Sequence, residues 1–220
     1  MPLSSRPPVR GLVLAAGSGS RMGRPKALIR PRGDGPTLVG RAVEVLVRGG
    51  CEGVTVVVGA AADEVVAVLG EASEEVDIVR CEDWSEGMGA SLRAGLTALT
   101  LRSEVEAVLI GLVDLPDVGP PVVRRLLDAQ KLSTRSSGAP PSPIEWTGSA
   151  AWRSELSRAA YGGVPGHPTL IGRDHWAGVI KVAQGDRGAR DYFRAHEHRL
   201  VECGDLATGR DVDTPADLDR

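Results

Sequence analysis

Cysteine is scarce in this sequence, and its few copies form no recognisable pattern. Cys51, Cys81 and Cys203 are widely separated, with no Cys-x-x-Cys pair and no nearby histidine at zinc-binding spacing. An odd number of isolated cysteines argues against a disulfide scaffold and against a structural zinc site. We therefore expect reduced thiols and a cytoplasmic protein.

The sequence also has no excess of positive charge and no long apolar run. The formal net charge is -3 and the isoelectric point is about 5.9, so no overall positive field attracts nucleic acid or an anionic membrane. No apolar stretch follows the first ten residues, MPLSSRPPVR, and no apolar run reaches the ~18 residues that a membrane span needs. We expect no nucleic-acid partner, no membrane segment and no signal peptide.

What is present is the composition of an ordinary globular protein. The 220 residues are 42% hydrophobic and 25% charged, which is enough for one compact domain over residues 1–220. Short apolar runs alternate with segments of helical periodicity. The expected strands are residues 9–16, 54–58, 76–80 and 107–113, and the expected helices are residues 38–47, 63–69 and 91–101. This alternation predicts an α/β fold, a three-layer, doubly wound, mostly parallel sheet with helices on both faces.

The alternation breaks at residues 131–149. This stretch, KLSTRSSGAPPSPIEWTGS, is rich in serine, glycine and proline and has no helical or strand period, which predicts a flexible loop or lid. Short strand and helix signals follow at residues 168–171, 176–182, 189–196 and 199–203. The run Thr214-Pro215-Ala216-Asp217 has the capping threonine, the proline and the acid of a helix start, so we expect a final helix.

A glycine-rich loop follows the first expected strand, in the motif LAAGSGSRMGRPK. Its glycines are Gly17, Gly19 and Gly23, and two of its cations are Arg21 and Lys26. Glycine lets the backbone turn tightly and bring N–H groups against phosphate oxygens, while the cations neutralise the remaining charge. The loop therefore predicts a polyphosphate site.

Two other phosphate-binding motifs do not fit this loop. The dinucleotide fingerprint Gly-x-Gly-x-x-Gly fails because the third glycine comes one place too late, and the P-loop fails because Ala27 follows Lys26. A tight turn with a surface arginine is the alternative without function. The presence of both Arg21 and Lys26 favours the phosphate site.

Asp114 comes directly after the expected strand at residues 107–113. Ligands of parallel α/β sheets gather at the carboxyl ends of strands, so Asp114 is expected in the same crevice as the glycine loop. Magnesium is usually held by one or two carboxylates, and Asp213 is the candidate partner. The alternatives are that Asp114 caps a helix and that Asp213 serves a turn, with Asp117 and Asp211 as neighbouring acids.

Two further segments carry chemistry. In CEDWSEGMGASLRAGL, the Gly87-Met88-Gly89 backbone and the Ser91 hydroxyl lie at an expected helix N-terminus, which favours an anion, although an ordinary helix cap explains them equally well. His167 lies in GGVPGHPTL, upstream of GDRGAR, and a lone histidine between glycine and proline is more often structural than catalytic.

These motifs together resemble the MobA-like nucleotidyltransferases, and within them the molybdenum cofactor cytidylyltransferases. The matching segments are LAAGSGSRMGRPKAL, DWSEGMGASLRAGL, VDLPDV, YGGVPGHPTL, GDRGAR and DVDTPADL, in the order that the family uses. The resemblance implies a nucleotidyltransferase Rossmann-like fold. It implies nucleotide binding by Leu14, Ala15, Ala16, Gly17, Ser18 and Gly19, catalytic roles for Arg21, Lys26 and Asp114, metal binding by Asp114 and Asp213, and an acceptor near Gly87, Met88, Gly89, Ser91 and His167.

The implied reaction is transfer of a nucleoside monophosphate, from CTP by preference, to the terminal phosphate of a molybdopterin-type cofactor with release of pyrophosphate. The implied cofactor is Mg²⁺, and the product would pass to a molybdoenzyme. Guanylyl or sugar-phosphate nucleotidyl transfer shares every phosphate-handling residue. A non-catalytic nucleotide or cofactor-binding maturation protein has little need of paired carboxylates, and a nicotinamide-dependent oxidoreductase is disfavoured by the shifted third glycine.

Overall fold

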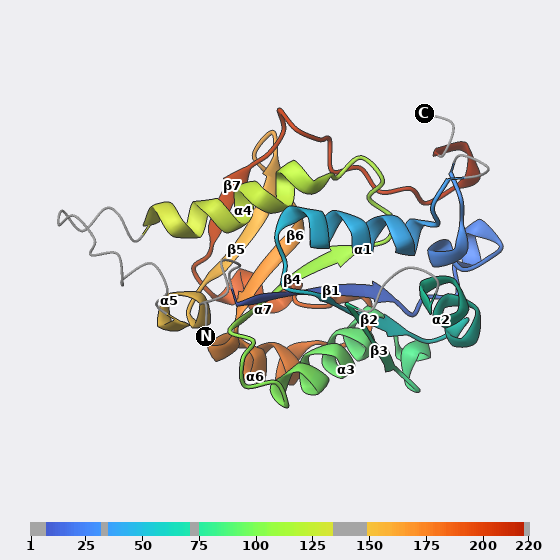
Figure 1. Cartoon of the computed structure of the whole chain (residues 1–220), viewed down its shortest axis with the longest axis horizontal. Coiled ribbons are helices and arrows are strands. Elements are labelled where there is room, and N and C mark those ends of the chain that lie inside the picture. Colours follow the sequence, from blue (N-terminus) through green and yellow to red (C-terminus); the bar gives the residue numbers. More distant parts are fainter. Residues whose placement is uncertain (1–7, 32–34, 71–74, 134–148, 218–220) are drawn as a thin grey trace.

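A seven-stranded sheet forms the middle of the computed structural model, which describes residues 8–31, 35–70, 75–133 and 149–217 (Figure 1). The strand order is β3-β2-β1-β4-β6-β5-β7. The strands are β1 (Val9–Ala15), β2 (Val54–Val58), β3 (Val76–Arg80), β4 (Ala107–Leu112), β5 (Leu156–Tyr161), β6 (Val164–Gly172) and β7 (Arg199–Glu202). Only β6 runs against the others, because it pairs antiparallel with both β4 and β5. The predicted mostly parallel sheet is confirmed.

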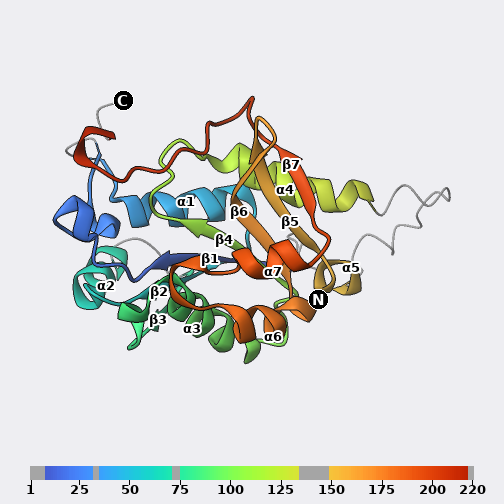
Figure 2. The same cartoon turned by 180° about the vertical axis from the view of Figure 1, so that it is seen from behind.

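Helices cover both faces of this sheet, as predicted (Figures 1 and 2). One face carries α1 (Leu38–Gly49), α2 (Ala62–Gly70) and α4 (Pro120–Ser133), and the other carries α3 (Met88–Thr100), α6 (Arg173–Val182) and α7 (Arg190–Ala195). Thr37 caps α1 by accepting from the Gly40 amide at 3.2 Å, and Gly50 ends the helix in a left-handed conformation.

Alternating side chains of the central strands supply the two halves of the core. On β1, Val13 packs with the α1 and α4 side, whereas Leu12 and Leu14 pack with the α3 and α6 side. Strand β1 is buried along its whole length, which explains its continuous apolar sequence. Its parallel neighbours β2 and β4 place the carboxyl ends of all three strands at one edge.

The ends of the predicted loop at residues 131–149 are helical. Helix α4, which the sequence analysis does not predict, continues to Ser133, and the short helix α5 (Ser149–Arg153) begins at the other end. The prediction of a flexible loop or lid over residues 134–148 lies outside the described residues. Strand β5 is likewise unpredicted, while β6, α6, α7 and β7 overlap the short signals expected after residue 167.

The expected final helix is described only at its start. Thr214 donates through its amide and its hydroxyl to Asp217 Oδ2, at 2.9 and 2.6 Å, and residues 215–217 form the 3-10 turn η7. These contacts match the predicted capping pattern. Residues 218–220 lie outside the described chain.

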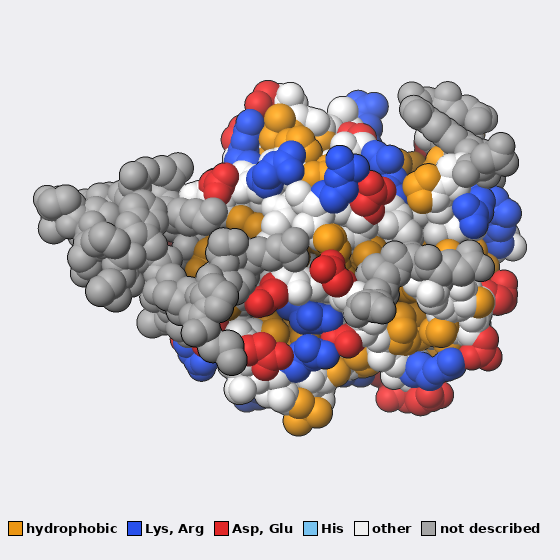
Figure 3. Space-filling view, viewed as in Figure 1, with side chains coloured by type: hydrophobic (Ala, Val, Ile, Leu, Met, Phe, Trp, Pro, Cys, Tyr) orange, Lys and Arg blue, Asp and Glu red, His pale blue; other side chains and the backbone are white. Residues whose placement is uncertain are grey.

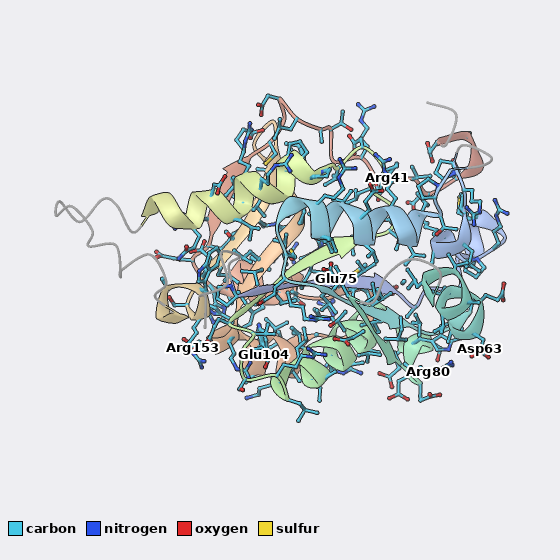
Figure 4. All side chains as sticks on the ribbon, viewed as in Figure 1. Arg41, Asp63, Glu75, Arg80, Glu104 and Arg153 are labelled. Atoms are coloured by element: carbon cyan, nitrogen blue, oxygen red, sulfur yellow. The ribbon has the colours of Figure 1, made fainter. Side chains whose placement is uncertain are left out.

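The cysteines are buried thiols, and the surface carries charges of both signs. All three cysteines are buried and free, and burial raises the pKa of Cys51 to about 12. Basic and acidic side chains are interspersed over α1 and α4 on the face in Figure 3. Ion pairs lie on the surface. One joins Arg80 and Asp63 at 2.6 Å, and both residues are labelled in Figure 4. Within the described residues, no helix has both the length and the apolar character to cross a membrane.

Candidate active site

The glycine-rich loop leaves the carboxyl end of β1 and folds back on itself. Gly19 has a φ of 64°, and a Cβ atom there would overlap the carbonyl oxygen of Arg24, so only glycine fits this position. The loop continues through two 3-10 turns, η1 (Ser20–Met22) and η2 (Lys26–Leu28). The backbone of Arg21 lies in η1, but its side chain is outside the described part of the structure, so its role stays a prediction.

Lys26 lies between two carboxylates that come from distant parts of the chain. Its Nζ donates to Asp114 Oδ2 at 3.0 Å and to Asp213 Oδ1 at 2.6 Å. Asp114 follows β4, and the neighbouring Val212 amide donates to the Asp114 carbonyl at 2.8 Å, which holds Asp213 in place. Burial opposes the charge of Lys26, but the hydrogen bonds and charges of the two aspartates outweigh it and raise the lysine pKa. The site therefore holds a persistent cation between the two predicted metal ligands.

Asp114 and Asp213 also have the donor chemistry of a magnesium site. Asp114 Oδ1 is buried and has no hydrogen-bond partner within the described part of the chain. A buried oxygen of this kind is costly unless a cation or donor reaches it. The described residues contain no cluster of three or more histidine, cysteine or acidic side chains that could hold a metal ion. The arrangement fits a metal that is held by two carboxylates and arrives with phosphate ligands.

A cleft of about 450 Å³ opens beside these residues, and we call it the loop cleft. Its lining contains the predicted residues Leu14, Ala15, Ala16, Gly17, Ser18, Gly19, Lys26, Gly87, Met88, Ser91 and Asp114. Trp84 and Asp186 also line it. The structure thus brings together three segments that are far apart in sequence, at the carboxyl edge of the sheet where α/β proteins bind ligands.

The start of α3 faces the loop cleft, although not every residue there does. Helix α3 begins at Met88, three residues before the predicted start at Ser91. Gly89 lines neither the loop cleft nor its neighbour, because its backbone packs against Gln184, where a Cβ atom would lie 2.7 Å from the amide nitrogen. The close approach of helix and loop explains this glycine, and its predicted contact with an acceptor stays a prediction.

A second cavity of about 320 Å³ adjoins the loop cleft, and we call it the arginine pocket. The two cavities share Leu14, Met88, Leu112, Asp114 and Asp186. The arginine pocket is also lined by His167, Arg158, Arg187, Arg190 and Asp211. Asp114 therefore lies at the boundary between the two cavities.

His167 lines the arginine pocket on β6, just before a cis peptide bond to Pro168. Burial, together with the positive charges of Arg158 and Arg190, lowers the pKa of His167 to about 4. His167 is therefore a neutral imidazole near pH 7. It can exchange hydrogen bonds with a ligand, but it supplies no positive charge.

Sequence reasoning missed several residues of this site. Arg190 belongs to the quoted GDRGAR motif, which signalled the segment without assigning the side chain. Arg158 lies in β5, and no pattern in the sequence marks it. Asp117, a neighbouring acid, accepts from the amide and hydroxyl of Thr208, both at 2.6 Å, and thereby fastens the C-terminal segment.

Comparisons with known proteins extend over most of the chain. A curated relative, nicotine blue oxidoreductase from Paenarthrobacter nicotinovorans, is 38% identical, with 94% of this chain and 93% of the relative covered. The crystal structure of Rv0371c from Mycobacterium tuberculosis is similar with a TM-score of 0.71 and 27% identity, covering 98% of this chain and 97% of that one. The crystal structure of Rv0371c in complex with manganese has a TM-score of 0.63 and 26% identity, covering 88% and 86%.

The sequence profile of the MobA-like NTP transferase domain matches residues 11–200. That range includes the glycine-rich loop, Lys26, Asp114 and the arginine pocket up to Arg190. With the sheet order and the site geometry in agreement, the chain belongs to the MobA-like NTP transferase family.

Proposed function

We propose that this chain transfers a nucleoside monophosphate from a nucleoside triphosphate to a phosphate-bearing acceptor and releases pyrophosphate. The observation that carries the proposal is Lys26, bound to both Asp114 and Asp213 beside the loop cleft. Paired carboxylates and a lysine at the end of a glycine-rich loop are the groups that a metal–triphosphate complex requires.

In this proposal the loop cleft binds the nucleotide. Backbone N–H groups of the glycine-rich loop contact the phosphates, and Lys26 and Arg21 stabilise the charge that builds on pyrophosphate. Asp114 and Asp213 would hold Mg²⁺, which supplies charge neutralisation at the phosphate oxygens. The manganese complex of the Rv0371c structure supports a divalent cation in this family.

The arginine pocket would hold the acceptor. An oxygen of the acceptor's terminal phosphate forms a bond to the α-phosphorus, the bond to the bridging oxygen of the β-phosphate breaks, and pyrophosphate leaves. The attacking phosphate is already ionised near neutral pH, so no general base is needed. Within this scheme we favour CTP as nucleotide, a molybdopterin-type cofactor as acceptor and a molybdoenzyme as recipient of the product.

A second candidate is oxidoreduction, which the 38% identity to nicotine blue oxidoreductase favours. In that case the loop cleft would hold a reduced nicotinamide dinucleotide, hydride would pass to an oxidised aromatic ring, and water would supply the proton. The pair of aspartates around Lys26 has no evident task in hydride transfer, so we place this candidate second.

The test measures pyrophosphate release from CTP, GTP, ATP and UTP with Mg²⁺, with and without molybdopterin cofactor. Wild type is compared with Asp114→Ala and with the control Asp63→Ala, whose carboxylate lies on α2 and pairs with Arg80. Release that needs Asp114 but not Asp63 supports the proposal, and the nucleotide and acceptor that give it identify the substrates. Oxidation of reduced nicotinamide dinucleotide without any pyrophosphate release would favour the second candidate instead.

A further inference from the structure

Two arginines in the arginine pocket have no acidic partner in the part of the chain that the structure describes. Within the described residues, neither Arg158 nor Arg190 forms an ion pair, and the only hydrogen bond of the Arg158 guanidinium runs from Nε to the Gly166 carbonyl at 3.2 Å. Other arginines of the same region are paired, since Arg187 and Arg194 both contact Asp191, at 3.1 and 3.5 Å. Of the three arginines that line the pocket, Arg187 is paired, whereas Arg158 and Arg190 have no ion pair in the described part of the chain.

Arg158 is held in position by other contacts, although no carboxylate of the described chain binds it. Its guanidinium carbon lies 5.2 Å from the centre of the ring of Phe193, which is itself buried. Together with the bond to Gly166, this contact leaves the two terminal nitrogens directed to no acceptor among the described residues. Both arginines line the same pocket, and burial and the charge of Arg190 both lower the pKa of Arg158.

The acidic and basic side chains of the arginine pocket line different parts of it. Asp114 and Asp186 line the part that is shared with the loop cleft, and Asp114 is already bound to Lys26. Asp211, from the exposed C-terminal segment, is the remaining acid in the lining. Two neighbouring guanidiniums next to a neutral imidazole match a doubly charged phosphate monoester, which can accept two forked pairs of hydrogen bonds.

We propose that Arg158 and Arg190 form the subsite that binds the phosphate monoester of the acceptor. That the bound phosphate belongs to the acceptor rests on the proposed function. Binding of an anion at this subsite can be measured without any catalytic turnover. Arg158 supplies the preorganised fork from β5, and Arg190 supplies the second cation from the first turn of α7.

The experiment titrates inorganic phosphate into the full-length protein and follows NMR signals of the Arg158 Nε–H group and of the backbone amides of residues 188–190. Wild type is compared with Arg190→Gln, with Arg158→Lys, which keeps the charge but removes the fork, and with Arg194→Gln. The last variant is the matched control, because Arg194 lies on the same helix and outside the pocket lining.

We expect phosphate to shift the Arg158 signal and Arg190→Gln to weaken phosphate affinity by roughly tenfold or more, as the loss of a charge-assisted contact implies. Arg158→Lys should weaken it less than Arg190→Gln does, and Arg194→Gln should leave it unchanged. Equal affinity of wild type and Arg190→Gln, or shifts confined to residues 17–26, would overturn the subsite.

A parallel titration with CTP and Mg²⁺ separates this inference from the proposed function. CTP should bind Arg190→Gln as it binds wild type, because Arg190 lies outside the loop cleft. If CTP fails to bind wild type while phosphate shifts Arg158, the proposed nucleotide chemistry fails and the anion subsite stands. If CTP binds and phosphate does not reach Arg158, the subsite fails and the nucleotide chemistry stands.

Discussion

The C-terminal segment determines where Asp213 lies, and a single glycine tests this. After β7 the chain runs back across the sheet toward the loop that follows β1 (Figure 2). Gly209 on this segment has a φ of 65°, and a Cβ atom there would overlap the ring of Tyr161. The Tyr161 hydroxyl donates to the His167 carbonyl at 2.7 Å, so the ring is not free to move aside.

The size of the effect of Gly209→Ala follows from two contributions. A left-handed conformation costs a non-glycine residue about 1–2 kcal/mol, and forcing a methyl group into an occupied space adds about 1–3 kcal/mol. We expect a loss of roughly 2–5 kcal/mol in the free energy of unfolding, or relief of the clash by displacement of the segment. The control is Gly162→Ala, because Gly162 has a φ of 59° but nothing within 4 Å of its added Cβ atom.

The assay combines denaturant unfolding with pyrophosphate release. If Gly209→Ala unfolds at lower denaturant concentration than Gly162→Ala, the difference measures the clash with Tyr161. If both are equally stable but only Gly209→Ala loses turnover, the segment has moved and has carried Asp213 away from Lys26. Equal stability and equal turnover of the two variants would refute the reasoning, because the segment would then neither pack against Tyr161 nor position the carboxylate.

Three further predictions concern the site itself. His167→Asn should flatten the pH dependence of the free energy of unfolding. A histidine in the unfolded chain binds a proton near pH 6.5, whereas His167 in the folded protein does so only at about pH 4, so the wild type loses up to about 3 kcal/mol of stability as the pH falls from 6.5 to 4. Denaturant unfolding at several pH values measures this loss. Lys26→Met and Arg21→Ala should each lower the rate of pyrophosphate release roughly a hundredfold, and unchanged turnover would remove that residue from the proposed mechanism. Gly19→Ala should abolish CTP binding in a calorimetric titration, because its added Cβ atom would overlap the Arg24 carbonyl. The Cβ atom added in Gly17→Ala meets open space, so this variant should keep the fold of the loop.

The central part of the fold is predictable because its signals are local. The four strands β1 to β4 are apolar or alternating runs ended by glycine or charged residues, and three of the helices between them show clear periodicity. Strand β5 escapes prediction because it carries Ser157 and Arg158 among its apolar residues. It is a strand because it lies between β6 and β7, and this pairing with later segments cannot be recognised in the local sequence of residues 156–161.

The residues of the site also differ in whether local sequence patterns reveal them. The glycine-rich loop and Asp114 follow strands that could be recognised, so the rule that ligands bind at carboxyl edges places both correctly in one cleft. The sequence predicts that Asp114 and Asp213 share a site. That Lys26 lies between them and binds both is visible only in the three-dimensional structure. At Gly89 the close packing of α3 against Gln184 already accounts for a glycine, and its predicted contact with an acceptor stays a prediction.

The reversed direction of β6 explains why a second cavity adjoins the first. In its pairing with β4, Thr169 of β6 lies opposite Ile110, so the earlier residues of β6 extend beyond the carboxyl end of β4. His167 therefore reaches the edge of the sheet where Asp114 follows β4, and the end of β5 reaches the same edge because it runs parallel to β4. A parallel strand in place of β6 would send its first residues, His167 among them, to the opposite edge of the sheet and away from Asp114.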